Sequence, residues 1–516
     1  MPSLAVFGCG ALVFVLPLIF PLGIARDFPN HLARVFIQYR LDQDPLLAAN
    51  YVLEWRLIPH LAMDLFAVPF AGWLSPYLIG GLFNGLTLLL LFSAGVALQR
   101  RHAGAISLWA LLPLVFVFNE ALRWGFMNFL FSVGLALWVV HFWLGGGPVL
   151  RWQRLVFLAA AQLALFFAHL LGFLLCGYLI LVLELHRAWR ERRQGLAQCL
   201  SVFFRHMTPF IAPLLLFAYL LLLQGGVGDG ETSYGNVGTK AAAFWSPTSA
   251  LAIPAGPLIL LASLLLVYSL LRRRLAVIDG QLKPLLWAML VLVVAMPNKN
   301  LGIWGLDFRF PAVALILLVA AVRPSSSLGG TALLNAVLAA LVGTALLAGG
   351  LAMAGKDREL QAIRQALQQA EPGGALLVAG GYDPVCRGCY PAWADYLHSG
   401  SLAVIERSMF VPMLFTVTSP VAAAPARANL DVPYGWPPSE EVLRDDRHRS
   451  LGEPLRQHDP DHRYWHGWPK HFDYLLWLRQ NGTELHGLEE LEKVTEGRLF
   501  VLYRITAPAA TGGSGR

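Results

Sequence analysis

Charged side chains are scarce in this chain of 516 residues, since Asp, Glu, Lys and Arg together make up 14% of it. Hydrophobic residues make up 56%, and the mean hydropathy is +0.56. The charged share is lower, and the hydrophobic share is higher, than in an ordinary soluble domain. Long apolar runs fill residues 4–352, whereas residues 356–516 carry charged and turn residues at ordinary density. We therefore expect an α-helical polytopic membrane protein, with residues 1–355 in the membrane domain and residues 356–516 in a soluble α/β domain.

Several signatures of known chemistry are also missing. The sequence has no Walker motif, no GxGxxG after a predicted strand and no HExxH, so nucleotide-driven transport has no support. Cysteine is rare, and only Cys386 and Cys389 form a motif, a single CxxC. One such pair is too little for a four-ligand zinc site, and outside the cytoplasm it predicts a local disulfide.

The net charge of +7 comes mainly from Arg residues in short loops between apolar runs. Because these residues do not follow one soluble face, we expect no nucleic-acid partner and interpret them as topology signals. The apolar runs cover residues 4–24, 77–98, 105–118, 126–144, 155–185, 207–223, 250–271, 285–296, 310–322 and 331–353.

The run at 155–185, interrupted by His169, forms either one long helix or two short ones. Only two passes place every compact basic cluster on the cytoplasmic side of the membrane, together with the N-terminus. We therefore expect about eleven transmembrane helices. The C-terminal domain then lies outside, which for the inner membrane of a bacterium is the periplasm. In that domain we expect helices at 357–370 and 485–494 and strands at 375–379, 402–405, 474–478 and 499–505.

The long first outer loop, residues 26–76, opens with a sharp pattern. At 100° per residue, Asp27, His31, Arg34 and Gln38 share one stripe of a helix whose neighbouring face is apolar. The pattern predicts an interfacial amphipathic helix with a carboxylate, an imidazole and a guanidinium facing water or a cavity. In the alternative interpretation Asp27 only caps this helix.

This motif resembles the GT-C superfamily of integral-membrane glycosyltransferases. Its protein O-mannosyltransferase and lipid A aminoarabinose transferase branches open the first outer loop with Asp, an acidic residue, two variable residues and Tyr or His. Here the segment reads Asp27-Phe28-Pro29-Asn30-His31. The resemblance implies that Asp27 is the base that activates the acceptor, with His31 beside it in the site. Phe28 replaces the second acidic residue, so the use of a divalent metal stays open.

Glu120 matches a second outer-loop acid that several branches of the superfamily carry. Its alternative role is a charged pair with Arg123 three residues later, at the membrane boundary. Both interpretations stay open. His169 is expected to be a hydrogen-bonded structural residue, and His60 and Asp64 in the first loop are further candidates.

Cationic residues in outer loops could hold the phosphate of a lipid-linked sugar donor, since Arg offers a bidentate fork to such anions. The candidates are Lys299, Arg309, Arg123 and Arg34. The alternative is that such residues snorkel to lipid headgroups.

The resulting hypothesis is a membrane glycosyltransferase that moves a sugar from a polyprenyl-phosphate donor to an outer-face acceptor, which is a glycan, a lipid or a protein. Its other partners are membrane lipids. The rival enzyme is an O-antigen ligase or polymerase, which places its key Arg and His residues in a large late outer loop. The other rivals are a transporter or flippase, which needs more ionisable residues near mid-membrane, and a scaffold for glycan assembly.

Overall fold

The computed structural model describes residues 2–24, 26–104, 106–146, 152–223, 231–251, 254–300, 303–325, 332–382, 391–416, 419–432, 435–452, 462–480 and 482–506. The chain forms two compact units, called here the helical unit and the mixed unit. The helical unit comprises Met1–Ile19, Ile58–Ala62 and Leu82–Met353. The mixed unit comprises Phe20–Leu57, Met63–Gly81 and Ala354–Arg516. Most of the first loop therefore belongs to the same compact unit as the C-terminal part of the chain.

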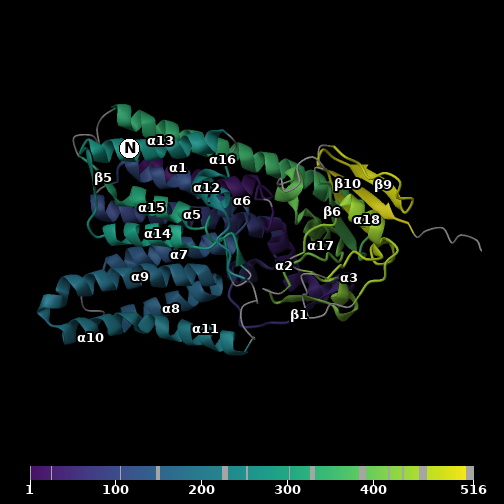
Figure 1. Ribbon diagram of the computed structural model, residues 1–516, viewed down its shortest axis with the longest axis horizontal. Coiled ribbons are helices and arrows are strands. Elements are labelled where there is room, and N and C mark those ends of the chain that lie inside the picture. The colour runs from purple at the N-terminus through teal and green to yellow at the C-terminus, as the bar shows by residue number, and fades with distance from the viewer. Residues whose placement is uncertain are drawn as a thin grey trace, which may run out of the picture. The chain divides into compact units, whose positions relative to one another are not determined.

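Helices dominate the helical unit (Figure 1). Seven helices within the described residues are long and apolar enough to cross a membrane, and shorter apolar helices accompany them. The long helices are α1 (Pro2–Ile19), α5 (Pro76–Ala103), α7 (Met127–Leu144), α9 (Leu170–Glu191), α13 (Ala255–Arg272), α16 (Ala332–Leu367) and a span, Ala197–Leu220, over α10 (Leu196–Met207), η5 (Thr208–Phe210) and α11 (Ile211–Leu223). The shorter ones are η3 (Leu108–Val117), α8 (Trp152–Ala168), α14 (Lys283–Ala295) and α15 (Pro311–Ala321). They follow the predicted apolar runs, and the number of membrane crossings stays a prediction.

The run at 155–185 forms two helices, as expected, because the chain turns at His169. This residue has an extended backbone, and its Nδ1 accepts a hydrogen bond from the Leu171 amide at 3.1 Å, which caps α9. Gly172 then allows α9 to approach α7, since a Cβ there would lie 2.0 Å from Ser132 Oγ. Helices α7, α8 and α9 pack side by side (Figure 1). His169 therefore has the structural role expected of it.

Short elements complete the helical unit. Strand β2 (Ala276–Ile278) pairs with β5 (Val322–Pro324), and β3 (Lys299–Asn300) pairs with β4 (Ile303–Trp304), both antiparallel. The short helices are α6 (Glu120–Arg123), η4 (Arg192–Gln194), α12 (Val237–Trp245) and η6 (Ser246–Thr248).

A four-stranded sheet organises the mixed unit, with the order β6 (Leu376–Gly380), β8 (Tyr474–Leu478), β10 (Phe500–Ile505) and β9 (Leu491–Glu496). Strands β6 and β8 are parallel and buried along their whole length, as expected of strands covered on both faces. Strand β1 (Tyr51–Leu53) pairs with β7 (Val421–Ala423) and so joins the first loop to the C-terminal part. The predicted α/β character of the C-terminal part is confirmed.

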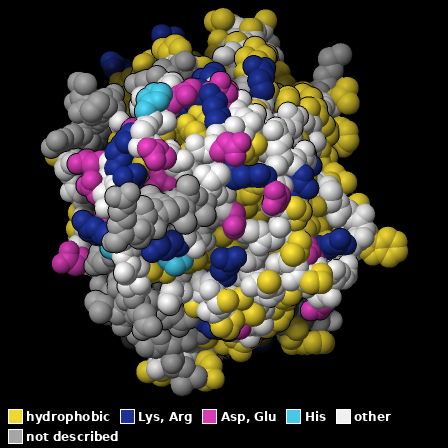
Figure 2. Space-filling model, turned by 90° about the vertical axis from the view of Figure 1, so that its right-hand side faces the viewer, with side chains coloured by type: hydrophobic (Ala, Val, Ile, Leu, Met, Phe, Trp, Pro, Cys, Tyr) yellow, Lys and Arg dark blue, Asp and Glu magenta, His cyan; other side chains and the backbone are white. Residues whose placement is uncertain are grey.

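Helices and turns surround this sheet. They are α2 (Phe28–Arg40), η1 (Leu41–Gln43), α3 (Pro45–Asn50), α4 (Ala62–Ala67), η2 (Val68–Phe70), η7 (Ala392–Tyr396), η8 (Ser399–Ser401), α17 (Leu402–Arg407), η9 (Pro425–Leu430), α18 (Glu440–Asp446) and η10 (Trp468–Lys470). On the face shown in Figure 2, basic and acidic side chains are interspersed with hydrophobic ones, a mixture typical of a surface in water.

Two local predictions are wrong. Residues 402–405 form α17 rather than a strand, because a short apolar run carries no period that separates strand from helix, and packing decides. Residues 485–494 do not form a helix, because residues from Leu491 onward pair with β10 as strand β9. The predicted helix at 357–370 exists, but as the end of α16.

Candidate active site

Helix α2 begins just after Asp27, where Pro29 in the first turn costs no hydrogen bond. Its apolar face is buried, and Phe28 and Leu32 pack against Gly80 of α5. A Cβ at Gly80 would lie 2.6 Å from Leu32 and 2.7 Å from Phe28, so the glycine permits this close approach. The helix that carries the candidate residues is therefore fixed by packing in the mixed unit.

Asp27 occupies the N-cap position of α2, but its side chain makes no capping hydrogen bond. Its Oδ1 instead lies 3.6 Å from Nε2 of His398, and the Asp27 and His398 side chains are 15% and 7% exposed. The preceding residue, Arg26, has a positive φ of 58°, and its amide donates to the carbonyl of Asp395 at 2.7 Å. A left-handed backbone is unusual for a residue other than glycine. Because the Asp27 side chain makes no capping hydrogen bond, capping does not explain the carboxylate at this position.

His398 precedes η8 and is held among rings. The Phe415 ring lies 5.1 Å from the His398 ring and 5.8 Å from the His31 ring, edge-on to both. Burial and the nearby Arg26 guanidinium lower the pKa of His398 to about 3, while a backbone hydrogen bond with Met413 acts in the opposite direction. The imidazole is therefore neutral at physiological pH.

Further polar groups fix the surroundings of Asp27. The Asn30 side chain donates to the Met413 carbonyl at 3.0 Å and accepts from the Ser401 hydroxyl. Lys356 Nζ lies 3.7 Å from the carboxylate of Asp395. The group that we call the Asp27 site consists of Arg26, Asp27, His31, Lys356, Asp395 and His398. Of these, sequence reasoning found Asp27 and His31 and missed the others, which have no spacing that marks them.

The polar stripe of α2 does not lie open to water along its length. Arg34 is buried and forms an ion pair with Asp64, whose other carboxylate oxygen accepts from the Gln38 amide. Asp64, a minor candidate from the sequence, is thus the partner of this stripe. His60, the other minor candidate, belongs to the helical unit. Arg34 therefore holds the first loop together and is not displayed to a phosphate.

The remaining candidates gather in the helical unit around a group that we call the aromatic cluster: Trp124, Phe126, Phe129, Trp304 and Phe308. The ring centroids of Trp124 and Trp304 are 4.3 Å apart, and those of Trp124 and Phe308 are 5.8 Å apart. These contacts join the segment after α6 to β4 and the segment that follows it, which lie far apart in the sequence.

Arg309 is buried in this cluster and does not snorkel. Its guanidinium lies 4.0 Å from the centre of the Phe126 ring and donates to the carbonyls of Gly305 at 3.3 Å and Trp304 at 3.0 Å. Cations over aromatic faces are stabilised, most strongly where water is excluded. Arg309 therefore shapes the β4 segment.

Glu120 accepts a hydrogen bond from Trp124 Nε1 at 2.6 Å and pairs with Arg123 at 3.4 Å. The expected i,i+3 pair is present, and the indole contact ties the carboxylate to the aromatic cluster as well. Lys299 is exposed, and it lies opposite Trp304 in the β3–β4 hairpin, so the two side chains share one face. The helical unit thus brings Glu120, Arg123, Lys299 and Arg309 around the same rings.

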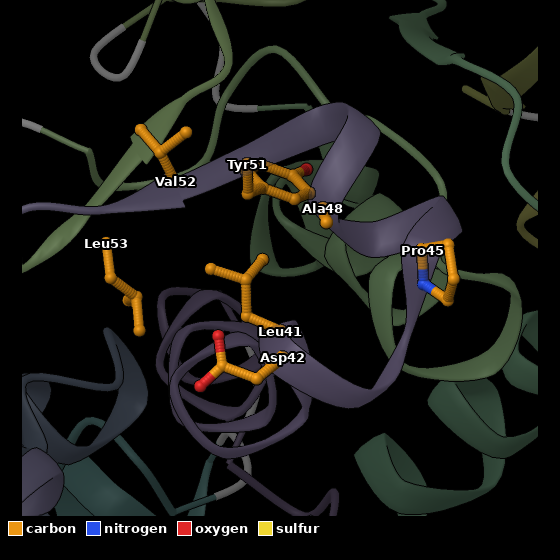
Figure 3. A pocket seen from close by; sticks show the side chains of 7 residues that line it. All are labelled: Leu41, Asp42, Pro45, Ala48, Tyr51, Val52 and Leu53. Atoms are coloured by element: carbon orange, nitrogen blue, oxygen red, sulfur yellow. The ribbon is translucent and has the colours of Figure 1, made fainter.

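A separate pocket in the mixed unit has a volume of about 480 Å³ and opens to solvent. Figure 3 shows its lining, which consists of Leu41, Asp42, Pro45, Ala48, Tyr51, Val52 and Leu53. Its walls are mainly apolar, and Asp42 contributes one carboxylate. None of the candidate site residues lines it, so the pocket lacks the convergent polar groups of a catalytic site.

Within the described parts of the chain, no group of three or more His, Cys, Asp and Glu side chains is placed to hold a metal ion. Cys386 and Cys389 lie outside the described residues, so their expected disulfide stays a prediction.

Comparisons with known proteins find a similar structure but no match by sequence. No protein-family model matches the chain, and no curated protein matches it significantly. Among solved structures, the chain is similar to ArnT from Cupriavidus metallidurans bound to undecaprenyl phosphate, with 12% sequence identity and a TM-score of 0.50. The match covers 98% of this chain and 99% of that chain. The chain thus has an ArnT-like fold, which confirms the fold that the first-loop motif implied.

Proposed function

We propose that this protein is an inverting membrane glycosyltransferase that moves a sugar from a polyprenyl-phosphate donor to an acceptor hydroxyl on the outer face of a bacterial inner membrane. The observation that carries the proposal is the Asp27 carboxylate, which begins α2 without capping it and is held beside His398. The GT-C-like fold supports it, as does the undecaprenyl phosphate bound to the structurally similar ArnT.

In the proposed step, a carboxylate oxygen of Asp27 takes the proton of the acceptor hydroxyl. The acceptor oxygen bonds to the anomeric carbon of the donor sugar, and the bond from that carbon to the phosphate oxygen breaks. The bonding electrons leave with the phosphate, and the configuration at the anomeric carbon inverts. A positioned general base contributes about 10²- to 10⁴-fold in rate. A carboxylate suits this task because it is ionised at neutral pH.

We assign the binding of the donor phosphate to cationic residues of the helical unit. Lys299 is exposed, and Arg123 keeps a partly exposed guanidinium beside Glu120. These two residues can meet an anion, whereas Arg309 is occupied by two backbone carbonyls and holds the hairpin in place. Arg34 is left out of this assignment, because its charge is already balanced by buried Asp64.

The test is transfer of labelled sugar from a panel of radiolabelled undecaprenyl-phosphate sugars by membranes that contain the full-length protein. Asp27→Asn removes the base without changing the shape of the side chain, so transfer should fall by about 10² to 10⁴. The matched control is Asp44→Asn, because Asp44 caps α3 by accepting from the amides of Leu46 and Leu47 at 3.0 and 3.2 Å. Asparagine caps about as well as aspartate.

The control variant should therefore keep its activity. Protein amounts are equalised, and each variant is checked for a single peak in size exclusion. An Asp27→Asn protein that still transfers sugar at most of the original rate would remove Asp27 from the reaction.

A further inference from the structure

Three arginines meet at the C-terminal end of α7, in a part of the helical unit that the proposed transfer step does not use. Arg101, near the end of α5, donates from Nη2 to the carbonyl of Leu144 at 2.8 Å. Arg154 of α8 donates from Nη2 to the carbonyl of Phe142 at 2.6 Å. Arg187 of α9 is the third member. We call these three residues the arginine group.

Positive charge is left over in the arginine group. Arg101 and Arg187 both lie within electrostatic range of Arg154. Arg187 pairs with Glu184 at 3.4 Å, and within the described residues this is the only ion pair that any of the three arginines makes. The Glu184 carboxylate is buried and also lies 2.6 Å from His206 Nδ1. One shared carboxylate does not balance three guanidinium groups, so an anion is stabilised beside them.

Capping of α7 accounts for only a part of this arrangement. Cations are favourable near the C-terminus of a helix, where Arg101 and Arg154 serve the last carbonyls. These bonds occupy one terminal nitrogen of each guanidinium, whereas an arginine carries five N–H donors in a planar fork. Such a fork fits the oxygens of a phosphate.

Exposed aromatic side chains border the arginine group. Phe142 of α7 and Phe157 of α8 are half-exposed, and their ring centroids lie 5.4 Å apart. Arg154 is bonded to the carbonyl of this same Phe142, so the rings and the guanidinium are neighbours. Trp152, two residues before Arg154, is exposed as well. A free phosphate would leave these rings in water, whereas the acyl chain of a lipid would cover them.

Helix α7 separates the arginine group from the aromatic cluster. Phe126, a member of that cluster, immediately precedes α7, and the arginine group lies at the other end of the helix. The 18 residues of α7 rise by roughly 27 Å, close to the thickness of a membrane core. The arginine group therefore belongs to the opposite membrane boundary, which the distribution of basic residues predicts to be the cytoplasmic one.

We propose that the arginine group binds the headgroup phosphate of an anionic phospholipid of the cytoplasmic leaflet, with an acyl chain lying on Phe142 and Phe157. Arg101 and Arg154 donate to the phosphate oxygens, and Arg187, held by Glu184, adds positive charge. The bound lipid joins the ends of α5, α7, α8 and α9. This site is independent of the proposed transfer reaction and of the donor lipid.

The experiment measures the binding of phosphatidylglycerol to the purified full-length protein in a neutral detergent by native mass spectrometry. Phosphatidylcholine with the same acyl chains is the reference, because its headgroup has no net charge. We expect phosphatidylglycerol to bind at least about tenfold more tightly. A large excess of glycerol phosphate should not displace it. Equal affinity for the two lipids, or displacement by glycerol phosphate, would overturn the proposal.

A matched pair of substitutions separates a built site from general surface charge. Arg101→Gln removes one guanidinium of the arginine group at an exposed position, so the affinity for phosphatidylglycerol should fall about tenfold. Arg273→Gln is the control, because Arg273 is also exposed and lies at the C-terminal end of α13, on the same predicted face. It should change the affinity less than about twofold. Equal losses in the two variants would overturn the proposal.

A second measurement uses the unaltered protein, so it does not depend on the folding of a variant. Phosphatidylglycerol with a photoactivatable diazirine in one acyl chain is added, the sample is irradiated, and the crosslinked peptides are identified by mass spectrometry. We expect crosslinks in the peptides that contain Phe142 and Phe157. Crosslinks confined to other parts of the helical unit would overturn the proposal.

Discussion

The Asp27 site and the aromatic cluster stabilise buried charge in different ways. Around Asp27, charged groups and imidazoles face one another, and burial keeps His398 neutral. In the aromatic cluster, the charge of Arg309 meets ring faces and backbone carbonyls. The first arrangement suits proton transfer, because protonation there depends on neighbours. The second suits the binding of an anion or a sugar ring, because it offers donors and flat apolar faces.

Both sites depend on the loops around them. In the first loop, the stability contribution of a buried ion pair can be compared with that of an ion pair on the surface. Asp64→Asn leaves the Arg34 guanidinium buried without its counter-charge. We expect a loss of about 3–5 kcal/mol in the free energy of unfolding of the mixed unit. Thermal unfolding in detergent, followed by tryptophan fluorescence, should show a clearly lower Tm.

The matched control is Glu54→Gln, because Glu54 pairs with Arg56 on the surface and both side chains are half-exposed. Its cost should stay within about 1 kcal/mol. The double variant Arg34→Met with Asp64→Leu should recover most of the lost stability, because an apolar pair needs no charge balance. Equal Tm values for Asp64→Asn and Glu54→Gln would show that the buried pair contributes no more than the exposed one.

A second buried carboxyl in the mixed unit makes stability depend on pH. Burial raises the pKa of Asp431 to about 7, although a hydrogen bond from Thr416 acts to lower it. The folded protein therefore holds a proton that the unfolded chain releases near pH 4, and stability falls as the pH rises from about 4 to about 7.

Asp431→Asn removes this dependence, so we expect it to raise the Tm by several degrees at pH 8 and to change it little at pH 4.5. Melting curves at the two pH values are the measurement. Asp42→Asn, at an exposed position, should shift the two curves equally. A benefit of Asp431→Asn that is as large at pH 4.5 as at pH 8 would contradict the role of the buried proton.

The sequence predicted much of this architecture for physical reasons. Apolar runs long enough for a membrane, a break at His169 and the helix that starts at Asp27 are all local properties of the chain, and the structure confirms the helices. The pair of Glu120 and Arg123 is also local and is present. The neighbours of Asp27 are not local, because His398 reaches it only through the fold of the mixed unit. Strand β9 and helix α17 were mispredicted for the same reason, since tertiary packing chose their conformation.

Within the aromatic cluster, we expect the shape of the Arg309 side chain to matter as much as its charge. Arg309→Lys keeps the positive charge but loses the planar fork that serves the carbonyls of Gly305 and Trp304. We expect binding of undecaprenyl phosphate to weaken about tenfold, equal to about 1.4 kcal/mol. Binding is measured with purified protein by fluorescence titration.

Arg323→Lys is the control for this change, because Arg323 forms an exposed pair with Asp279 in the same unit. It should leave the affinity for undecaprenyl phosphate unchanged. Unchanged affinity in Arg309→Lys as well would mean that the hairpin keeps its shape without the guanidinium fork.

The smallest effect is expected at Trp304, the most exposed ring of the aromatic cluster at 42%. It stacks on Trp124 and shares a face of the hairpin with Lys299, so a flat apolar surface lies beside a cation. A sugar ring can place its C–H groups on such a surface while its phosphate meets the cation. Aromatic contacts contribute about 0.5–1.5 kcal/mol beyond area burial. Trp304→Ala should therefore raise the KM for the undecaprenyl-phosphate sugar that the protein uses by about 2- to 10-fold and leave kcat nearly unchanged. Trp304→Phe keeps a ring and should cost less than half of that effect.

Trp73→Ala is the control, because Trp73 is also exposed but lies in the mixed unit outside this cluster. Equal KM values for Trp304→Ala and Trp73→Ala would show that the cluster binds no sugar and would leave only its charges to distinguish it from the Asp27 site.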